Sequence, residues 1–144
     1  MTDVDNIAME VKEGFAKDVA SGWEALVRYF ADPVEIAHVP PDPTDGPVPV
    51  DAASAYTRGV AVALSKINAF SYSADVRAEG GRITIDLTVS GQSVDGEAFT
   101  TPLSFECFID EGKLVRQVAT VDPESMAPLA HALAATGAFP TATH

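Results

Sequence analysis

The chain has little cysteine and little positive charge. Its only cysteine, Cys107, excludes an intrachain disulfide and a metal site built from several thiolates. Lysine and arginine number 9 against 21 aspartates and glutamates, which gives a formal net charge of −12. A field of this sign repels phosphate backbones and anionic lipid headgroups. We therefore expect neither nucleic acid nor a membrane surface as a partner.

Long apolar runs are also missing. No stretch reaches the roughly 18 consecutive apolar residues that a membrane span requires, and the N-terminal segment lacks the basic-then-apolar pattern of a secretory signal. With the single cysteine, this pattern predicts a cytoplasmic protein. The sequence contains no glycine-rich phosphate loop and no dinucleotide fingerprint. Its three histidines and one cysteine show no metal-ligand spacing, so we expect no metal and no cofactor.

The composition that remains is that of an ordinary globular protein. The 144 residues are 47% hydrophobic and 21% charged, which is enough apolar surface for one buried core. We predict a single domain over residues 1–136. The polar segment 137–144 is predicted to be a poorly ordered tail.

Apolar residues recur with a helical period in the first half of the chain. One stripe predicts a first helix that ends at Ser21 and Gly22, and a second stripe predicts a short helix that ends at Asp32 and Pro33. A third helix, capped by Asp51 or Ser54, is predicted to run to about Phe70. The residues of the first stripe are Ile7, Val11, Phe15 and Val19, and those of the second are Trp23, Leu26, Val27 and Phe30.

A short strand and a long loop separate the second and third helices. In the segment 34–39, His38 shares one side of the strand with Val34 and Ile36. The following segment 40–49 holds five prolines, so it cannot pair as a central strand and is predicted to be a stiff, extended loop. Loops of this length often carry function.

In the second half of the chain the period changes from 3.6 to 2. Alternating residues predict four strands joined by hairpins, and the turns fall at Gly80-Gly81, at Asp95-Gly96 and at the glycine that precedes Lys113. The last strand is predicted over Lys113 to Val121. Asp122, Pro123 and Glu124 suit the start of a final helix that ends at Gly137, and Pro128 leaves open a start a few residues later. The predicted architecture is α+β, with helices covering one face of a curved antiparallel sheet.

This order of elements resembles the cone-shaped, cystatin-like fold of nuclear transport factor 2, and within it the ketosteroid-isomerase-like and SnoaL-like polyketide cyclase families. The segments that carry the resemblance are WEALVRYFADPVEIAHVPP, VDGEAFTTPLSFECFIDEGKL and VRQVATVD. The resemblance covers nearly the whole chain. It implies a pocket for a small hydrophobic molecule inside the cone, and a homodimer formed through the outer face of the sheet, where Glu106 and Phe108 are expected.

The resemblance also implies candidate catalytic residues. His38 falls where steroid isomerases carry their carboxylate base, and histidine can gain or lose a proton near neutral pH. The hydrogen-bond donors of those isomerases fall near Phe15 and Phe105 here, so steroid isomerisation is not expected. SnoaL-like cyclases resemble the chain better, in the histidine before paired prolines and in an acid that ends the last strand, here Asp122.

Two functional hypotheses follow. The first is a cofactor-independent isomerase or cyclase in which His38 and Asp122 move protons on a hydrophobic carbonyl substrate. The second is a non-catalytic module of the same fold that binds a hydrophobic ligand or dimerises. For each candidate a structural role stays open, since His38 can be a core histidine and Asp122 can cap the last helix. Substrate contacts are expected from Trp23, Phe30, Tyr56, Phe105 and Arg116.

Overall fold

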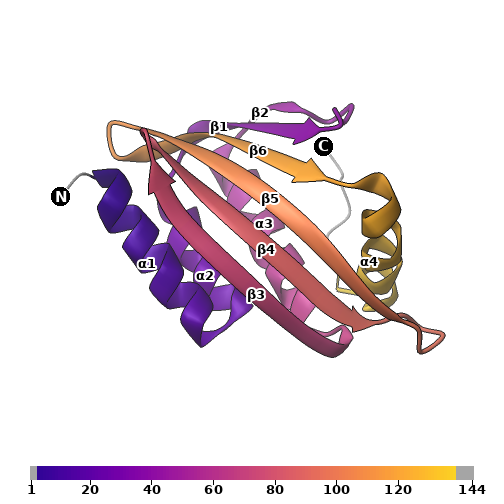
Figure 1. Cartoon of the computed structure of the whole chain (residues 1–144). Helices are drawn as coiled ribbons and strands as arrows, with labels where there is room; N and C mark the ends of the chain where they lie inside the picture. Colours follow the sequence, from indigo (N-terminus) through magenta and orange to yellow (C-terminus); the bar gives the residue numbers. More distant parts are fainter. Residues whose placement is uncertain (1–2, 139–144) are drawn as a thin grey trace.

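The computed structural model describes residues 3–138, in which four helices accompany one six-stranded sheet (Figure 1). The part of the predicted tail beyond Ala138 lies outside the described residues. In chain order the elements are α1 (Asp3–Lys17), α2 (Val19–Val27), β1 (Phe30–Val39), β2 (Gly46–Val48), α3 (Val50–Ser65), β3 (Asn68–Glu79), β4 (Arg82–Gln92), β5 (Ala98–Asp110), β6 (Lys113–Val121) and α4 (Pro123–Ala135).

The strands form one curved sheet in the order β2-β1-β6-β5-β4-β3. Neighbouring strands run antiparallel except β1 and β6, which run parallel, with His38 beside Ala119. The predicted α+β architecture is confirmed. The sheet is mixed rather than wholly antiparallel, because the first strand joins it beside the last one.

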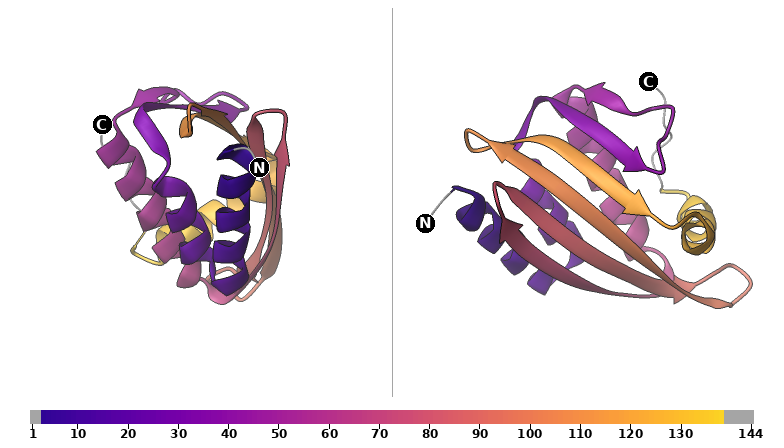
Figure 2. Two further views of the ribbon diagram at one scale, coloured as in Figure 1. Left: turned by 90° about the vertical axis from the view of Figure 1, so that its left-hand side faces the viewer. Right: turned by 45° about the horizontal axis from the view of Figure 1, so that its top comes forward.

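Three helices lie along the concave face of the sheet, and the fourth closes one end. Figure 2 shows α1, α2 and α3 on one side and the sheet curling over them on the other. Helix α4 packs against β5 at the end of the sheet where β6 finishes (Figure 1). None of the helices in residues 3–138 is both long enough and apolar enough to cross a membrane.

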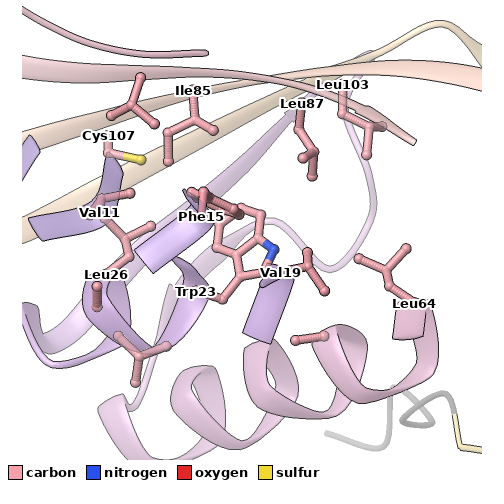
Figure 3. Close-up of a cluster of buried hydrophobic side chains, with 14 of the residues drawn as sticks. Val11, Phe15, Val19, Trp23, Leu26, Leu64, Ile85, Leu87, Leu103 and Cys107 are labelled. Carbon is pink, nitrogen blue, oxygen red and sulfur yellow. The ribbon is translucent and has the colours of Figure 1, made fainter. Parts of the chain in front are cut away.

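The core lies between the concave face and the helices (Figure 3). Trp23 stands at its centre, edge-on to Phe15 with ring centroids 5.5 Å apart and edge-on to Phe105 with centroids 5.0 Å apart. Cys107 is fully buried there, and burial raises the pKa of its thiol to about 12. A thiol with that pKa stays protonated at neutral pH, so Cys107 serves packing and not nucleophilic chemistry.

The boundary between the first two helices differs from the prediction. The break lies at Asp18, whose carboxylate Oδ1 accepts a hydrogen bond of 2.6 Å from the backbone N–H of Ser21 and so caps α2. Ser21 and Gly22 lie inside α2. Glycine at position 22 is required by packing, because a Cβ there would lie 2.3 Å from the ring of Phe15 in α1.

The proline-rich segment differs in one detail. It is mostly loop, as predicted, but it contains the edge strand β2, in which Val48 pairs with Val34 and Gly46 pairs with Ile36. Proline is tolerated there because an edge strand has one side without ladder hydrogen bonds. The strand β1 is also longer than predicted and begins at Phe30, with an irregularity before Glu35.

Candidate functional site

His38 lies on the concave face of the sheet, near its edge. The strand register puts His38 beside Ala119 of β6, and Ala119 opposite Phe105 of β5. Directly paired residues point to the same face of a sheet, and Phe105 packs on Trp23 in the core. The imidazole therefore faces the helices rather than the outer surface, and 34% of its side chain stays exposed.

A carboxylate from the proline-rich loop holds the imidazole. The Nδ1 atom of His38 lies 2.6 Å from Oδ1 of Asp45, and the backbone N–H of His38 donates to Oδ2 of the same side chain at 3.0 Å. Oδ2 also accepts from the backbone N–H of Asp42 at 3.1 Å. One carboxylate thus ties β1, the 42–45 turn and the histidine ring together.

The contact with Asp45 determines which nitrogen of the neutral imidazole carries the proton. The hydrogen bond to His38, with further bonds from the backbone N–H groups of Asp42 and His38, lowers the pKa of Asp45, so that its carboxylate is ionised near neutral pH and can only accept. The proton of the neutral imidazole is therefore on Nδ1, and the lone pair is on Nε2. Nε2 has no hydrogen-bond partner within residues 3–138.

The lowered pKa of Asp45 predicts a defined pH dependence of stability. The folded pKa lies below the unfolded value of about 3.9, so the contribution of this carboxylate is complete above that value and is lost as pH falls through the folded pKa. We expect Asp45→Asn to be less stable than the wild type in urea at pH 7 and at pH 5. The difference between the two midpoints should shrink as the pH falls below about 3.9. If the difference between the urea midpoints of the wild type and Asp45→Asn stays constant over this pH range, the charge of the carboxylate does not contribute to stability.

Asp122 takes the capping role. Its Oδ2 accepts from the backbone N–H of Ser125 at 3.1 Å and from the Ser125 hydroxyl at 2.8 Å, at the first turn of α4. It follows the end of β6 and is exposed, whereas His38 lies beside Ala119. In the part of the chain that is described, no hydrogen bond or ion pair joins His38 to Asp122. The structure does not pair the two predicted catalytic groups.

The two roles considered for Asp122 respond differently to substitution. Asp122→Ala removes the cap and is expected to lower the free energy of unfolding by about 1 kcal/mol. Asp122→Ser keeps an oxygen that can cap the helix but removes the carboxylate, so its thermal midpoint should stay near that of the wild type. Equal destabilisation by both substitutions, measured by thermal denaturation, would contradict the capping role.

The other predicted site residues lie in different environments. Trp23 and Phe30 are buried in the core, and Phe105 packs against Trp23 on the concave face. Tyr56 on α3 is 42% exposed. Desolvation and, second, the charge of Asp42 raise the pKa of its phenol, which puts that phenol near the 42–45 turn.

Arg116 lies on the opposite face of the sheet from His38. Its neighbour in the register is Glu35, whose Oε2 lies 3.7 Å from Nε of Arg116, and its guanidinium stands 5.7 Å from the ring centroid of Phe108. The sequence left open which side of this strand faces the interior. The register decides it, because Gln117 and not Arg116 shares a face with Cys107.

Two cavities lie elsewhere on the molecule. One of 390 Å³ lies between α2 and α3 and includes Trp23 in its lining, and one of 120 Å³ lies between Lys66 and α4. Neither lining includes His38 or Asp122. No three His, Cys, Asp or Glu side chains within residues 3–138 are grouped closely enough to hold a metal ion.

Sequence reasoning missed Asp45, the partner of His38. The available signal was the Asp45-Gly46 pair inside the proline-rich segment, which is a turn sequence and brings the chain back toward β1. A turn sequence predicts where the chain reverses, but it does not predict which residue the side chain of Asp45 contacts. The pairing of β2 with β1 supplies that information.

Comparison with known proteins gives the fold. No family model and no curated protein matches the sequence. Among solved structures, an NTF2-like protein of unknown function from Burkholderia pseudomallei is 19% identical, with a TM-score of 0.59 over 89% of this chain and 98% of that one. A putative isomerase from Bacillus subtilis is 11% identical, with a TM-score of 0.61 over 91% and 97%. The protein TerC, crystallised with polyporic acid, is 15% identical, with a TM-score of 0.58 over 88% and 96%.

Proposed function

From the premise that this chain has the nuclear transport factor 2-like fold, we propose that it is a cofactor-independent enzyme of the SnoaL-like or ketosteroid-isomerase-like type. In this proposal it binds a small hydrophobic carbonyl compound on the concave face and moves a proton on it. The observation that carries the proposal is the His38–Asp45 pair, 2.6 Å apart, on that face. The structural neighbours with a putative isomerase function or a bound small molecule support it as likenesses of fold.

In the proposed mechanism His38 is the base. Nε2 takes a proton from the carbon next to the substrate carbonyl, which leaves an enolate and an imidazolium. The carboxylate of Asp45 stabilises the imidazolium, as the carboxylate of a catalytic triad does. Return of the proton to a different carbon isomerises the substrate. If the enolate first closes a ring by attack on a second carbonyl, the proton goes to the new alkoxide and the product is cyclised.

In this proposal Asp45, and not Asp122 as the sequence suggested, is the acidic partner of His38 in catalysis. A carboxylate in contact with the imidazole can stabilise its positive charge, whereas Asp122 is committed to the α4 cap. Tyr56, near the 42–45 turn, is the proposed substrate contact on the helix side. We place the enzyme in the cytoplasm, and we place a homodimer contact on the outer sheet face, beside Arg116 and Phe108.

The test is proton exchange on a model ketone. 2-Tetralone has acidic protons next to its carbonyl, and their exchange in D₂O is followed by NMR. We expect the folded protein to accelerate exchange above the rate with the same concentration of free imidazole, saturably in ketone. A rate equal to that of free imidazole would remove the catalytic proposal. Binding of 2-tetralone without acceleration would leave the non-catalytic ligand-binding module in its place.

A further inference from the structure

Gln117 of β6 is a polar side chain on the concave face that has no part in the proton transfer described above. The register places it between Ile36 of β1 and Cys107 of β5. Cys107 is fully buried in the core, and directly paired residues point to the same face of a sheet, so the side chain of Gln117 faces the helices. Its neighbours along this side of β6, Ala119 and Val121, are apolar. A carboxamide therefore lies in an otherwise apolar row.

The carboxamide of Gln117 has no hydrogen-bond partner within residues 3–138. Its Oε1 is buried, although buried polar atoms are nearly always paired. Nε2 also lacks a partner but is not fully enclosed. An unpaired buried acceptor lowers stability, so an apolar side chain would suit this position better if folding alone mattered. A residue that breaks the packing rules in this way is typical of a functional site.

A small residue borders both Gln117 and the imidazole. Ala119 lies two positions after Gln117 on β6 and directly beside His38 of β1. It is buried, but among the described residues it is the one buried apolar side chain that lies outside the core cluster. The core side chains therefore do not pack on the methyl group between His38 and Gln117.

His38 and Gln117 are diagonal neighbours on adjacent parallel strands (Figure 1). A strand spacing of about 4.8 Å and a rise of about 3.3 Å per residue put their Cα atoms about 8 Å apart. Asp45 approaches the imidazole from the turn before β2, and β2 lies on the other side of β1 from β6. The side of the ring toward Gln117 is thus not occupied by Asp45. In a ketone one atom separates the reacting carbon from the carbonyl oxygen, so one ketone can contact both side chains.

We propose that Gln117 is a second catalytic residue, whose Nε2 donates a hydrogen bond to the substrate carbonyl oxygen. This inference rests on the proposed function of His38. When Nε2 of His38 takes the proton from the neighbouring carbon, the electron pair of the C–H bond forms the enolate, and negative charge develops on that oxygen. The hydrogen bond from Gln117 strengthens as the charge develops, which lowers the barrier. Gln117 thereby supplies the donor that is absent at Phe15 and Phe105.

Gln117→Met removes the amide and keeps a side chain of similar length. The saturated rate of 2-tetralone proton exchange should fall about 10²–10³-fold, while the ketone concentration at half saturation changes less than about threefold. The urea midpoint should equal or exceed that of the wild type, because the unpaired acceptor is gone. Thr120→Met puts the same side chain at an exposed position on the other face of β6 and should leave both measurements unchanged.

A binding experiment tests the same contact without turnover. 2-Naphthol has the ring shape and the enol oxygen of enolised 2-tetralone, and naphthalene lacks the oxygen. Gln92 and Gln117 are the only glutamines, so the side-chain amide signals of Gln117 in a ¹⁵N–¹H spectrum are assigned by their loss in Gln117→Met. We expect 2-naphthol to shift these signals saturably and naphthalene to shift them much less. The signals of Gln92, which is exposed, should stay in place.

The results separate this inference from the proposed function. Accelerated exchange by the wild type with the same rate in Gln117→Met would overturn the role of Gln117 alone. Gln117 signals that stay in place while 2-naphthol binds would overturn it as well. Loss of activity in Gln117→Met together with a lower urea midpoint would show a structural role instead. Shifted Gln117 signals in a wild type that does not accelerate exchange would remove the catalytic role, together with that of His38, and leave Gln117 as a ligand contact of a binding module.

Discussion

His38→Ala is expected to lower the protein-dependent rate of ketone proton exchange by about 10²–10⁴-fold, the usual contribution of a positioned general base. The substitution removes the imidazole whose Nε2 carries the free lone pair. The carboxylate of Asp45 stays, but a carboxylate is a much weaker base than an imidazole. The measurement is the NMR exchange rate of 2-tetralone in D₂O.

Two controls separate chemistry from folding in this experiment. His131→Ala removes an exposed histidine on α4 and should leave the exchange rate unchanged. His38→Gln keeps a polar side chain that can contact Asp45 but has no basic nitrogen, so it should be as inactive as His38→Ala while unfolding at a similar urea concentration. Full activity in His38→Gln would show that the imidazole is not the base.

Gly14→Ala is expected to lower the free energy of unfolding by about 3 kcal/mol, although alanine is normally the better helix former by up to about 1 kcal/mol. A Cβ at position 14 would lie 2.5 Å from the carbonyl oxygen of Ser21 and 2.9 Å from Cα of Gly22. These are backbone atoms, so no side-chain rotation relieves the contact, and α2 must move away from α1.

Urea unfolding followed by Trp23 emission measures this effect, because Trp23 lies on α2 and packs on Phe15 of α1. Glu13→Ala, one position earlier on an exposed part of α1, is the matched control and should change stability by less than about 0.5 kcal/mol. A Gly14→Ala protein as stable as the wild type would mean that the two helices are not packed this closely.

Helix and strand bounds that depend on residues close together in the sequence were predicted well. The last strand was predicted over Lys113 to Val121 and has those bounds, because a turn with glycine and a period of 2 are both local signals. The final helix begins at Pro123, the earlier of the two starts that the sequence left open, and Pro128 lies inside it. The break at Ser21 and Gly22 was wrong, since that glycine serves the contact with Phe15 rather than a turn.

The candidate site was predicted only in part. Alternation along the strand aligned His38 with Val34 and Ile36, and the register confirms that Ile36 and His38 share a face with Gln117 and Ala119. Its partner could not be predicted, because Asp45 reaches His38 only when the proline-rich segment folds back as β2. The position of Arg116 was undecided for a similar reason, since the two faces of a strand look alike until a neighbour is known.

By itself the sequence determined the α+β architecture, most of the strand and helix positions, and the acidic, single-cysteine character of the chain, because these depend on local periodicity and composition. The tertiary structure decided three further things: which carboxylate holds the imidazole, which residues face the helices, and where a cavity opens beside the only tryptophan. Each of these depends on groups far apart in the chain or in an irregular loop. The pairing of β2 with β1, the parallel pairing of β1 with β6 and the packing of α2 on α3 bring them together.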